Sequence, residues 1–279
     1  MSIWYAFWDM LPIEMFHWNF MKNALLAVLL MAPLFGILST TIVTGKMSFF
    51  SDALGHSAFT GIAIGAILGI AAPTVIAVIF SVLFSLLFSL VRAKSNQTAD
   101  TLIGVFSSTA VALGIFIATF GGGSFTKYNQ YLIGDILSVT SAELLALFIV
   151  LLTVLAFWLI VSNKMTLTSI YPQLASSRGI PVHLTQTIFT TLIAVVVTLS
   201  ISWVGLLILN SLLVLPAAAA RNISKNIRQY HGFSVLIALI ASVIGLCVSY
   251  YLGTSAGASI SLVLGIIFMF SFLFRKVRG

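Results

Sequence analysis

Charged residues are scarce in this sequence. Only 7% of its 279 residues are Asp, Glu, Lys or Arg, whereas soluble domains carry about 25%. A chain with so little charge and with 60% hydrophobic residues cannot build the surface of an ordinary soluble domain. Its apolar residues occur in long continuous runs, which favour membrane helices. We therefore expect an all-α, polytopic transmembrane helical bundle that forms a single domain over residues 1–279.

Other absences narrow the functional class. The single cysteine, Cys247, excludes an intrachain disulfide. The nucleotide-binding pattern G-x-x-x-x-G-K-[ST] does not occur, and neither does the zinc-protease pattern H-E-x-x-H. We expect no enzyme activity in this chain, so any ATP that powers it is hydrolysed by a separate protein. The first residues lack the charged start and the cleavage site of a signal peptide, so the spans themselves must direct membrane insertion.

The apolar runs predict eight full membrane spans. They are expected at 20–43, 47–70, 73–91, 101–120, 141–161, 185–209, 233–252 and 257–274. Residues 210–220 are shorter than the roughly 20 residues of a crossing and contain Pro216, so we expect a broken half-helix there. The aromatic-rich residues 1–18 are expected to lie at the membrane interface.

The basic residues indicate an orientation. If the N-terminus is outside and segment 210–220 crosses back to the inner side, eleven of the 13 Lys and Arg residues lie inside. The two outside are Lys22 and Lys127. The positive-inside rule therefore favours an outer N-terminus and a cytoplasmic C-terminus. The pI near 9.8 then reflects orientation in a lipid bilayer and not nucleic-acid binding.

The span that begins at Met47 contains an acid and an imidazole. Asp52 and His56 are four residues apart, which places both side chains on one face of a helix. A carboxylate at the centre of a membrane helix costs about 2.5–3.5 kcal/mol. His56 is expected roughly 13 Å from the inner boundary, near the midplane, because a helix rises about 1.5 Å per residue. Carboxylate oxygen and imidazole nitrogen are ligands that suit zinc and manganese.

Three interpretations of this pair are open. It can line a cation path, and two copies of the chain could then supply two Asp and two His to one four-coordinate ion. It can be a hydrogen-bonded pair that only fixes helix packing, or it can belong to a proton relay. Small residues beside the pair would let other helices or a narrow path approach closely: Gly55, Ser57, Thr60, Gly61 and Gly65.

Residues 163–184 form the longest polar stretch. A short amphipathic helix is expected over 172–178, ended by Gly179. On the basic side of the membrane, such a helix can dock a soluble partner. The alternative is a solvated loop helix that has no partner.

Several motifs resemble those of permease subunits of zinc/manganese ABC importers. They are M-S-F-F-S-D-A-L-G-H-S-A-F-T-G-I-A-I-G at 47–65, A-D-T-L-I-G-V-F-S-S at 99–108, Y-L-I-G-D-I-L at 131–137 and W-V-G-L-L-I-L-N-S-L-L-V-L-P-A-A-A-A-R at 203–221. The resemblance covers nearly the whole chain, and the first and last motifs are the specific ones. It implies a homodimer in the bacterial cell (inner) membrane that imports Zn²⁺ or Mn²⁺ as cargo. It also implies two kinds of partner, an extracellular or periplasmic metal-binding protein and cytoplasmic ATP-binding subunits.

The resemblance further implies roles for individual residues. Asp52 and His56 become the metal ligands of the translocation path. The segment 163–184 becomes the cytoplasmic coupling segment, whose contacts with the ATPase are assigned to Gln173, Leu174, Ala175, Arg178, Gly179 and Ile180. Tyr171-Pro172-Gln173 departs from the family pattern, because many relatives carry an acidic residue there.

Other functions remain open on the residues alone. A stand-alone secondary metal/proton transporter would work without an ATPase, although its two halves should resemble each other by hydropathy. An ABC permease for metal chelates such as siderophores would not need an Asp–His pair at the midplane. A scaffold subunit that transports nothing would tolerate loss of both side chains.

Overall fold

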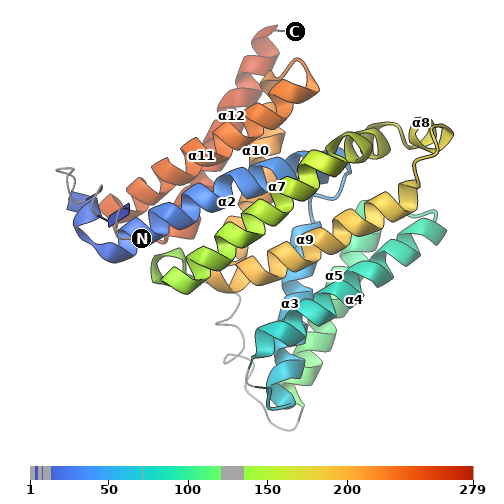
Figure 1. The fold of residues 1–279 in the computed structure, drawn as a ribbon, viewed down its shortest axis with the longest axis horizontal. Helices are drawn as coiled ribbons and strands as arrows, with labels where there is room; N and C mark the ends of the chain where they lie inside the picture. The colour runs from blue at the N-terminus through green and yellow to red at the C-terminus, as the bar shows by residue number, and fades with distance from the viewer. Residues whose placement is uncertain (1–3, 6–7, 9–13, 71, 121–134, 279) are drawn as a thin grey trace. The chain divides into compact units, whose positions relative to one another are not determined.

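The chain is described here by a computed structural model that covers residues 4–5, 8, 14–70, 72–120 and 135–278. Within these residues every regular element is a helix, which confirms the all-α prediction. Their long helices are α2 Asn19–Thr44, α3 Phe50–Ile67, α4 Pro73–Lys94, α5 Ala99–Thr119, α7 Ser141–Ile170, α9 Val182–Val204, α10 Leu206–Ile223, α11 Ile227–Leu252 and α12 Ala256–Arg278 (Figure 1). Shorter elements are η1 Glu14–His17, η2 Ile136–Ser138 and α8 Pro172–Ser177.

Some predictions lie outside the described residues. They include most of the interfacial segment 1–18, the outer residue Lys127 and the first part of the motif at 131–137. The described part of the N-terminal segment contacts α2, because Tyr5 donates a hydrogen bond to Oδ1 of Asn23 over 2.6 Å. The interfacial location of the segment stays a prediction.

Eight helices in the described part of the chain are long and apolar enough to cross a membrane. They are α2, α4, α5, α7, α9, α10, α11 and α12. Helix α3, which carries Asp52 and His56, is not among them, because its polar residues and glycines lower its hydropathy. Most of its residues are instead buried. A helix that is shielded by other helices does not need a lipophilic surface all round.

The broken half-helix expected at 210–220 is not found. These residues belong to α10, an 18-residue helix that continues through Pro216. The chain is interrupted earlier, at Gly205, where α9 ends one residue before and α10 begins one residue after. Gly205 has a φ of 89°, which side-chain-bearing residues rarely adopt. Hydropathy does not detect this break, because apolar residues continue on both sides of it.

Helix α7 is longer than predicted. The expected span ended at 161, but α7 runs to Ile170. The polar stretch 163–184 therefore includes the end of α7 and the start of α9. Between them lie only α8 and the short connections on either side of it. The extra turns are polar, so they can extend beyond the apolar core of a bilayer without cost.

The chain divides into two compact units. One unit comprises 41–134 and 156–210, and the other comprises 1–40, 135–155 and 211–279. In the first unit α3 packs against α4, α5 and α9, as the blue, teal, green and yellow helices of Figure 1 show. In the second unit α11 packs against α12. Helix α10 begins in the first unit and continues in the second.

Small residues allow the helices of the first unit to approach closely. A Cβ added to Gly61 of α3 would lie 2.5 Å from the Cα of Ala77 on α4. The hydroxyls of Ser57 and Ser81 are hydrogen-bonded over 3.0 Å, and Thr60 donates to the carbonyl of Ala110 on α5 over 2.7 Å. Three of the small residues singled out in the sequence therefore pack α3 against its neighbours.

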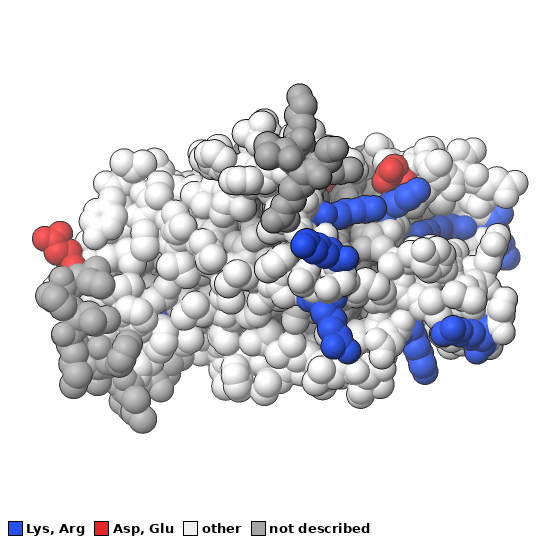
Figure 2. Space-filling view, turned by 90° about the horizontal axis from the view of Figure 1, so that it is seen from above, with Lys and Arg blue, Asp and Glu red and all other residues white. Residues whose placement is uncertain are grey.

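Basic residues of the first unit gather at one end of its helices. Arg92 in the last turn of α4 donates from Nη1 to Sδ of Met47, over 2.8 Å, so the end of α4 lies beside the turn that contains Lys46. The same end of α4 faces the start of α9 across a small cavity. Blue Lys and Arg side chains are visible on the face drawn in Figure 2. The proximity of Arg92 to the turn that contains Lys46 is what the positive-inside rule predicts for helix ends on a single side of a membrane.

Candidate functional site

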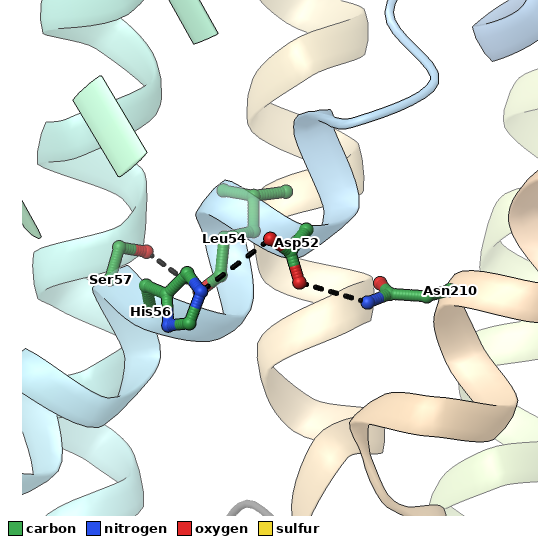
Figure 3. A network of polar contacts seen from close by, with 5 residues as sticks. All are labelled: Asp52, Leu54, His56, Ser57 and Asn210. Atoms are coloured by element: carbon green, nitrogen blue, oxygen red, sulfur yellow. Dashed lines mark hydrogen bonds and ion pairs between the residues drawn. The ribbon is translucent and has the colours of Figure 1, made fainter. Parts of the chain in front are cut away.

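Helix α3 brings Asp52 and His56 together. Asp52 lies in its first turn, and His56 lies one turn later on the same face. Oδ2 of Asp52 and Nε2 of His56 are 3.5 Å apart (Figure 3). The spacing predicted from the sequence is therefore realised as a contact. A carboxylate oxygen and an imidazole nitrogen lie close together here, and both are ligand types of divalent cation sites.

The third polar group at this point is Asn210, which sequence reasoning missed. Its Nδ2 donates a hydrogen bond of 3.1 Å to Oδ1 of Asp52. Figure 3 shows the amide of Asn210 reaching Asp52 from α10 while His56 approaches from the other side. The three residues belong to the same compact unit. One signal was available, since Asn210 is a polar residue within the quoted motif at 203–221.

Glycines position α10 beside α3. Gly205 makes the turn that starts α10, five residues before Asn210. A Cβ added to Gly55 would lie 2.4 Å from Cδ1 of Leu206, so a larger residue at this place on α3 would require the Leu206 side chain to move. Gly55 thus lets the first residue of α10 pack closely against α3.

One oxygen of the cluster has no partner. Oδ1 of Asn210 is buried and accepts no hydrogen bond from any described residue. An unpaired buried polar atom costs about 1–3 kcal/mol, so it needs an explanation, and a water or an ion is one. A carboxylate, an imidazole and an amide oxygen form a mixed N/O donor set, which suits zinc and manganese.

The cluster is open, unlike the rest of the helix around it. The side chains of His56 and Asp52 are 31% and 44% exposed, respectively. Their neighbours Ala53, Leu54 and Ser57 are buried. A pair that only fixes packing would be expected to lie in the packed face with Ser57, Thr60 and Gly61. The open position favours the interpretation in which the pair meets a ligand.

The cluster is small for a resident metal centre. In the part of the chain that the structure describes, no group of three or more His, Cys, Asp and Glu residues is placed to hold a metal ion. Asp52 and His56 contribute two such groups, and the third donor is an amide. Few and weak donors suit a cargo that must be released.

The segment assigned to coupling forms the predicted helix. Helix α8 covers Pro172–Ser177, is capped by Arg178 and is followed by Gly179 at a φ of 73°. Ile180 donates its backbone N–H to the carbonyl of Ala175 over 3.0 Å, which closes the turn. The local signals Pro172 and Gly179 therefore predicted both ends of this helix correctly.

The six residues assigned to coupling differ in exposure. Gln173, Leu174, Arg178 and Gly179 are exposed, Ile180 is half-buried and Ala175 is fully buried. A groove of about 660 Å³ lies between α8 and the start of α9, and its lining includes Gln173, Ile180 and Leu184. Ala175 can therefore support a docking surface only from beneath, whereas the exposed residues can contact a partner directly.

Membrane-length helices that surround a polar cluster of metal-ligand type define a polytopic membrane protein of the transporter class. The chain belongs to the ABC 3 transport family, whose model matches residues 17–275.

Curated relatives match over almost their whole length. The chain is 28% identical to the "High-affinity zinc uptake system membrane protein ZnuB" of Haemophilus influenzae, over 91% of this chain and 97% of that one. It is 30% identical to the "Manganese import system permease protein ScaB" of Streptococcus gordonii, over 91% of each chain. The solved structure "PsaBC from Streptococcus pneumoniae in complex with Fab" matches with a TM-score of 0.78 at 26% identity, covering 94% of this chain and 96% of that one.

Membership of an ABC transport family decides between two of the classes left open by the residues. It favours a membrane component of an ABC transporter over a stand-alone secondary transporter. The multi-pass membrane location follows from the eight apolar helices and from the same family.

Proposed function

We propose that this chain is the permease subunit of an ATP-driven importer that moves Zn²⁺ or Mn²⁺ into the cytoplasm. One observation carries the assignment of the path: Asp52, His56 and Asn210 converge at an open point of an otherwise buried helix. The full-length similarity to a zinc uptake protein and a manganese import permease supports the cargo.

The ion is held by this chain's own donors. Oδ2 of Asp52 and Nε2 of His56 are 3.5 Å apart, which is close to the separation of two neighbouring ligands of one cation. The amide of Asn210 already touches Asp52 and offers its unpaired Oδ1 as a third ligand. With three donors in one chain, a second copy is not needed to supply most of the coordination. Water or the delivering protein can complete it.

Asp52 is the charge that favours cation entry. A cation that leaves water loses hydration, and a carboxylate offsets part of that loss where other charges are rare. The hydrogen bond from Asn210 keeps the carboxylate oriented when no ion is present. Release is favoured because imidazole and amide ligands carry no net charge in their coordinating forms.

The test is metal uptake by the complete importer reconstituted in liposomes. Asp52→Asn keeps the shape of the side chain and removes its charge, so uptake should fall at least tenfold. Asp100→Asn, which removes an exposed charge in the first turn of α5, is the matched control and should leave uptake unchanged. Equal uptake by wild type and Asp52→Asn would remove the proposed ligand role.

We further propose that the importer is a homodimer of this chain with two cytoplasmic ATP-hydrolysing subunits and an external metal-binding protein. The N-terminus is outside, which assigns the basic end of α4, α8 and α9 to the cytoplasm. The exposed face of α8 and the groove beside it then form the seat for the ATPase.

The seat is tested by co-purification of the ATPase subunit. Leu174 is exposed on α8, and Leu174→Asp places a charge on this apolar contact and should prevent co-purification. Gln97→Asp introduces the same charge in the exposed connection between α4 and α5 and should have no effect. Normal co-purification of the Leu174→Asp variant would exclude this surface.

A further inference from the structure

A second polar site lies away from the Asp52 cluster, between the end of α4 and the start of α9. It is a cavity of about 90 Å³, whose lining includes Ser89 and Arg92 from α4 and His183, Gln186, Thr187 and Thr190 from α9. One water occupies about 30 Å³ of liquid, so the cavity has room for roughly three waters or for one tetrahedral anion. Among the described residues, no Asp or Glu lines it.

The positive charge of Arg92, which lines this cavity, is poorly compensated by its neighbours. Arg92 is half-buried, yet its Nη1 donates to the thioether sulfur of Met47, which is a weak acceptor. Within the described ranges the guanidinium forms no ion pair with a carboxylate. A guanidinium has five N–H donors, so most of them are available to a ligand. Burial of a charge is costly unless a partner of opposite sign is supplied.

The remaining lining offers donors that suit an oxyanion. The side chains of His183 and Gln186 can both donate N–H groups. The hydroxyls of Ser89 and Thr190 are hydrogen-bonded to each other over 2.9 Å and link the two helices beside the cavity. The cavity is therefore lined by one cation, Arg92, and by two further N–H donors, His183 and Gln186.

We propose that this cavity binds a phosphate group. The group can come from an anionic phospholipid or from free phosphate, and the surface beside the cavity favours the lipid. Leu86 and Leu90 lie within one turn of Ser89 on α4, and Ile188 follows Thr187 on α9; these apolar side chains are 38%, 62% and 45% exposed, respectively. A phosphate in the cavity would leave acyl chains free to lie along these side chains. Basic pockets between membrane helices recognise anionic headgroups in this way.

Binding is measured on the purified full-length chain in detergent, by native mass spectrometry and by thermal unfolding. The probes are phosphatidylglycerol and inorganic phosphate. Arg92→Gln should weaken phosphatidylglycerol binding about tenfold or more, because a hydrogen-bonded charge pair contributes about 1.5–3 kcal/mol. Lys94→Gln removes an exposed positive charge two residues further along and should leave binding unchanged.

Each outcome has a definite meaning. Protection by phosphatidylglycerol that is lost in Arg92→Gln supports the lipid as the source. Protection by inorganic phosphate alone, lost in the same variant, supports the phosphate site and assigns free phosphate as the source. If Arg92→Gln does not fold, His183→Ala on the exposed side of the cavity replaces it and should weaken binding severalfold. Wild-type affinity for both probes in Arg92→Gln or, where it is used, in His183→Ala would overturn the proposal.

Discussion

Asp52, His56 and Asn210 show how far single residues could be interpreted from the sequence. The pair was predictable, because a spacing of four residues on a helix is a local property that fixes which side chains meet. Asn210 was not, because it lies 158 residues from Asp52 and meets it only through the packing of α10 on α3. Its buried, unpaired Oδ1 is visible only in three dimensions.

The role of Asn210 leads to the first prediction. Asn210→Ala removes the hydrogen bond to Asp52 and the third ligand, so metal uptake should fall about 10-fold to 100-fold, as expected for a hydrogen bond to a charged group of about 1.5–3 kcal/mol. Uptake by the reconstituted importer is the measurement. Asn222→Ala is the control, since it removes an amide that bonds Ser271 and not Asp52. If Asn210→Ala transports as well as Asn222→Ala, the amide has no part in the site.

At the scale of elements, local signals predicted some boundaries and hydropathy misplaced others. Both ends of α8 were predictable from Pro172 and Gly179, which act on the backbone where they stand. The boundary between α9 and α10 was not, because Gly205 changes the chain direction without changing the apolar character of the run. The end of α7 was predicted too early, because the change from apolar to polar residues shows where a helix leaves the bilayer and not where the helix ends.

The close contact of α3 and α4 gives a prediction on stability. Gly61→Ala places a Cβ 2.5 Å from the Cα of Ala77, a backbone atom that cannot move aside cheaply. Overpacking of this kind costs about 1–3 kcal/mol, so the midpoint of thermal unfolding should fall. Thermal unfolding of the purified chain is the measurement.

Gly104→Ala is the matched control for that experiment. Gly104 lies on the exposed side of α5, and a Cβ there would meet nothing within 4 Å. Alanine is favoured over glycine inside a helix by about 0.5–1 kcal/mol, so this variant should be as stable as wild type or slightly more stable. A Gly61→Ala variant that behaves in the same way would show that α3 and α4 are not packed as described.

At the scale of the whole molecule, composition and charge predicted the class correctly. Scarce charge and long apolar runs are sufficient for an all-α membrane protein, because only helices satisfy their backbone within one segment. The structure has the expected number of eight apolar helices in its described part, but their identities differ from the prediction. Helix α10 is one of the eight, whereas α3 is not. Hydropathy could not show that α3 is shielded by neighbouring helices, since shielding is a property of the assembled bundle.

Orientation provides a prediction for the intact protein. In a Cys247→Ser background, Arg178→Cys should react with a membrane-impermeant thiol reagent only after the cytoplasmic side has been opened. Ala142→Cys, at the exposed start of α7, should react in intact cells. The reason is the basic cluster at the end of α4 and beside α8, which the positive-inside rule assigns to the cytoplasm. If Arg178→Cys reacts in intact cells and Ala142→Cys reacts only after the cytoplasmic side has been opened, the proposed orientation is wrong.

The most direct test of the account is equilibrium binding of Mn²⁺ to the purified importer without its external metal-binding protein, followed by electron paramagnetic resonance. Wild type should hold Mn²⁺ at a weak site in each copy of the chain. His183→Ala, which removes an exposed imidazole outside the cluster, should do the same. His56→Ala should lower the affinity at least tenfold. An unchanged affinity in His56→Ala would contradict the claim that Asp52, His56 and Asn210 hold the ion.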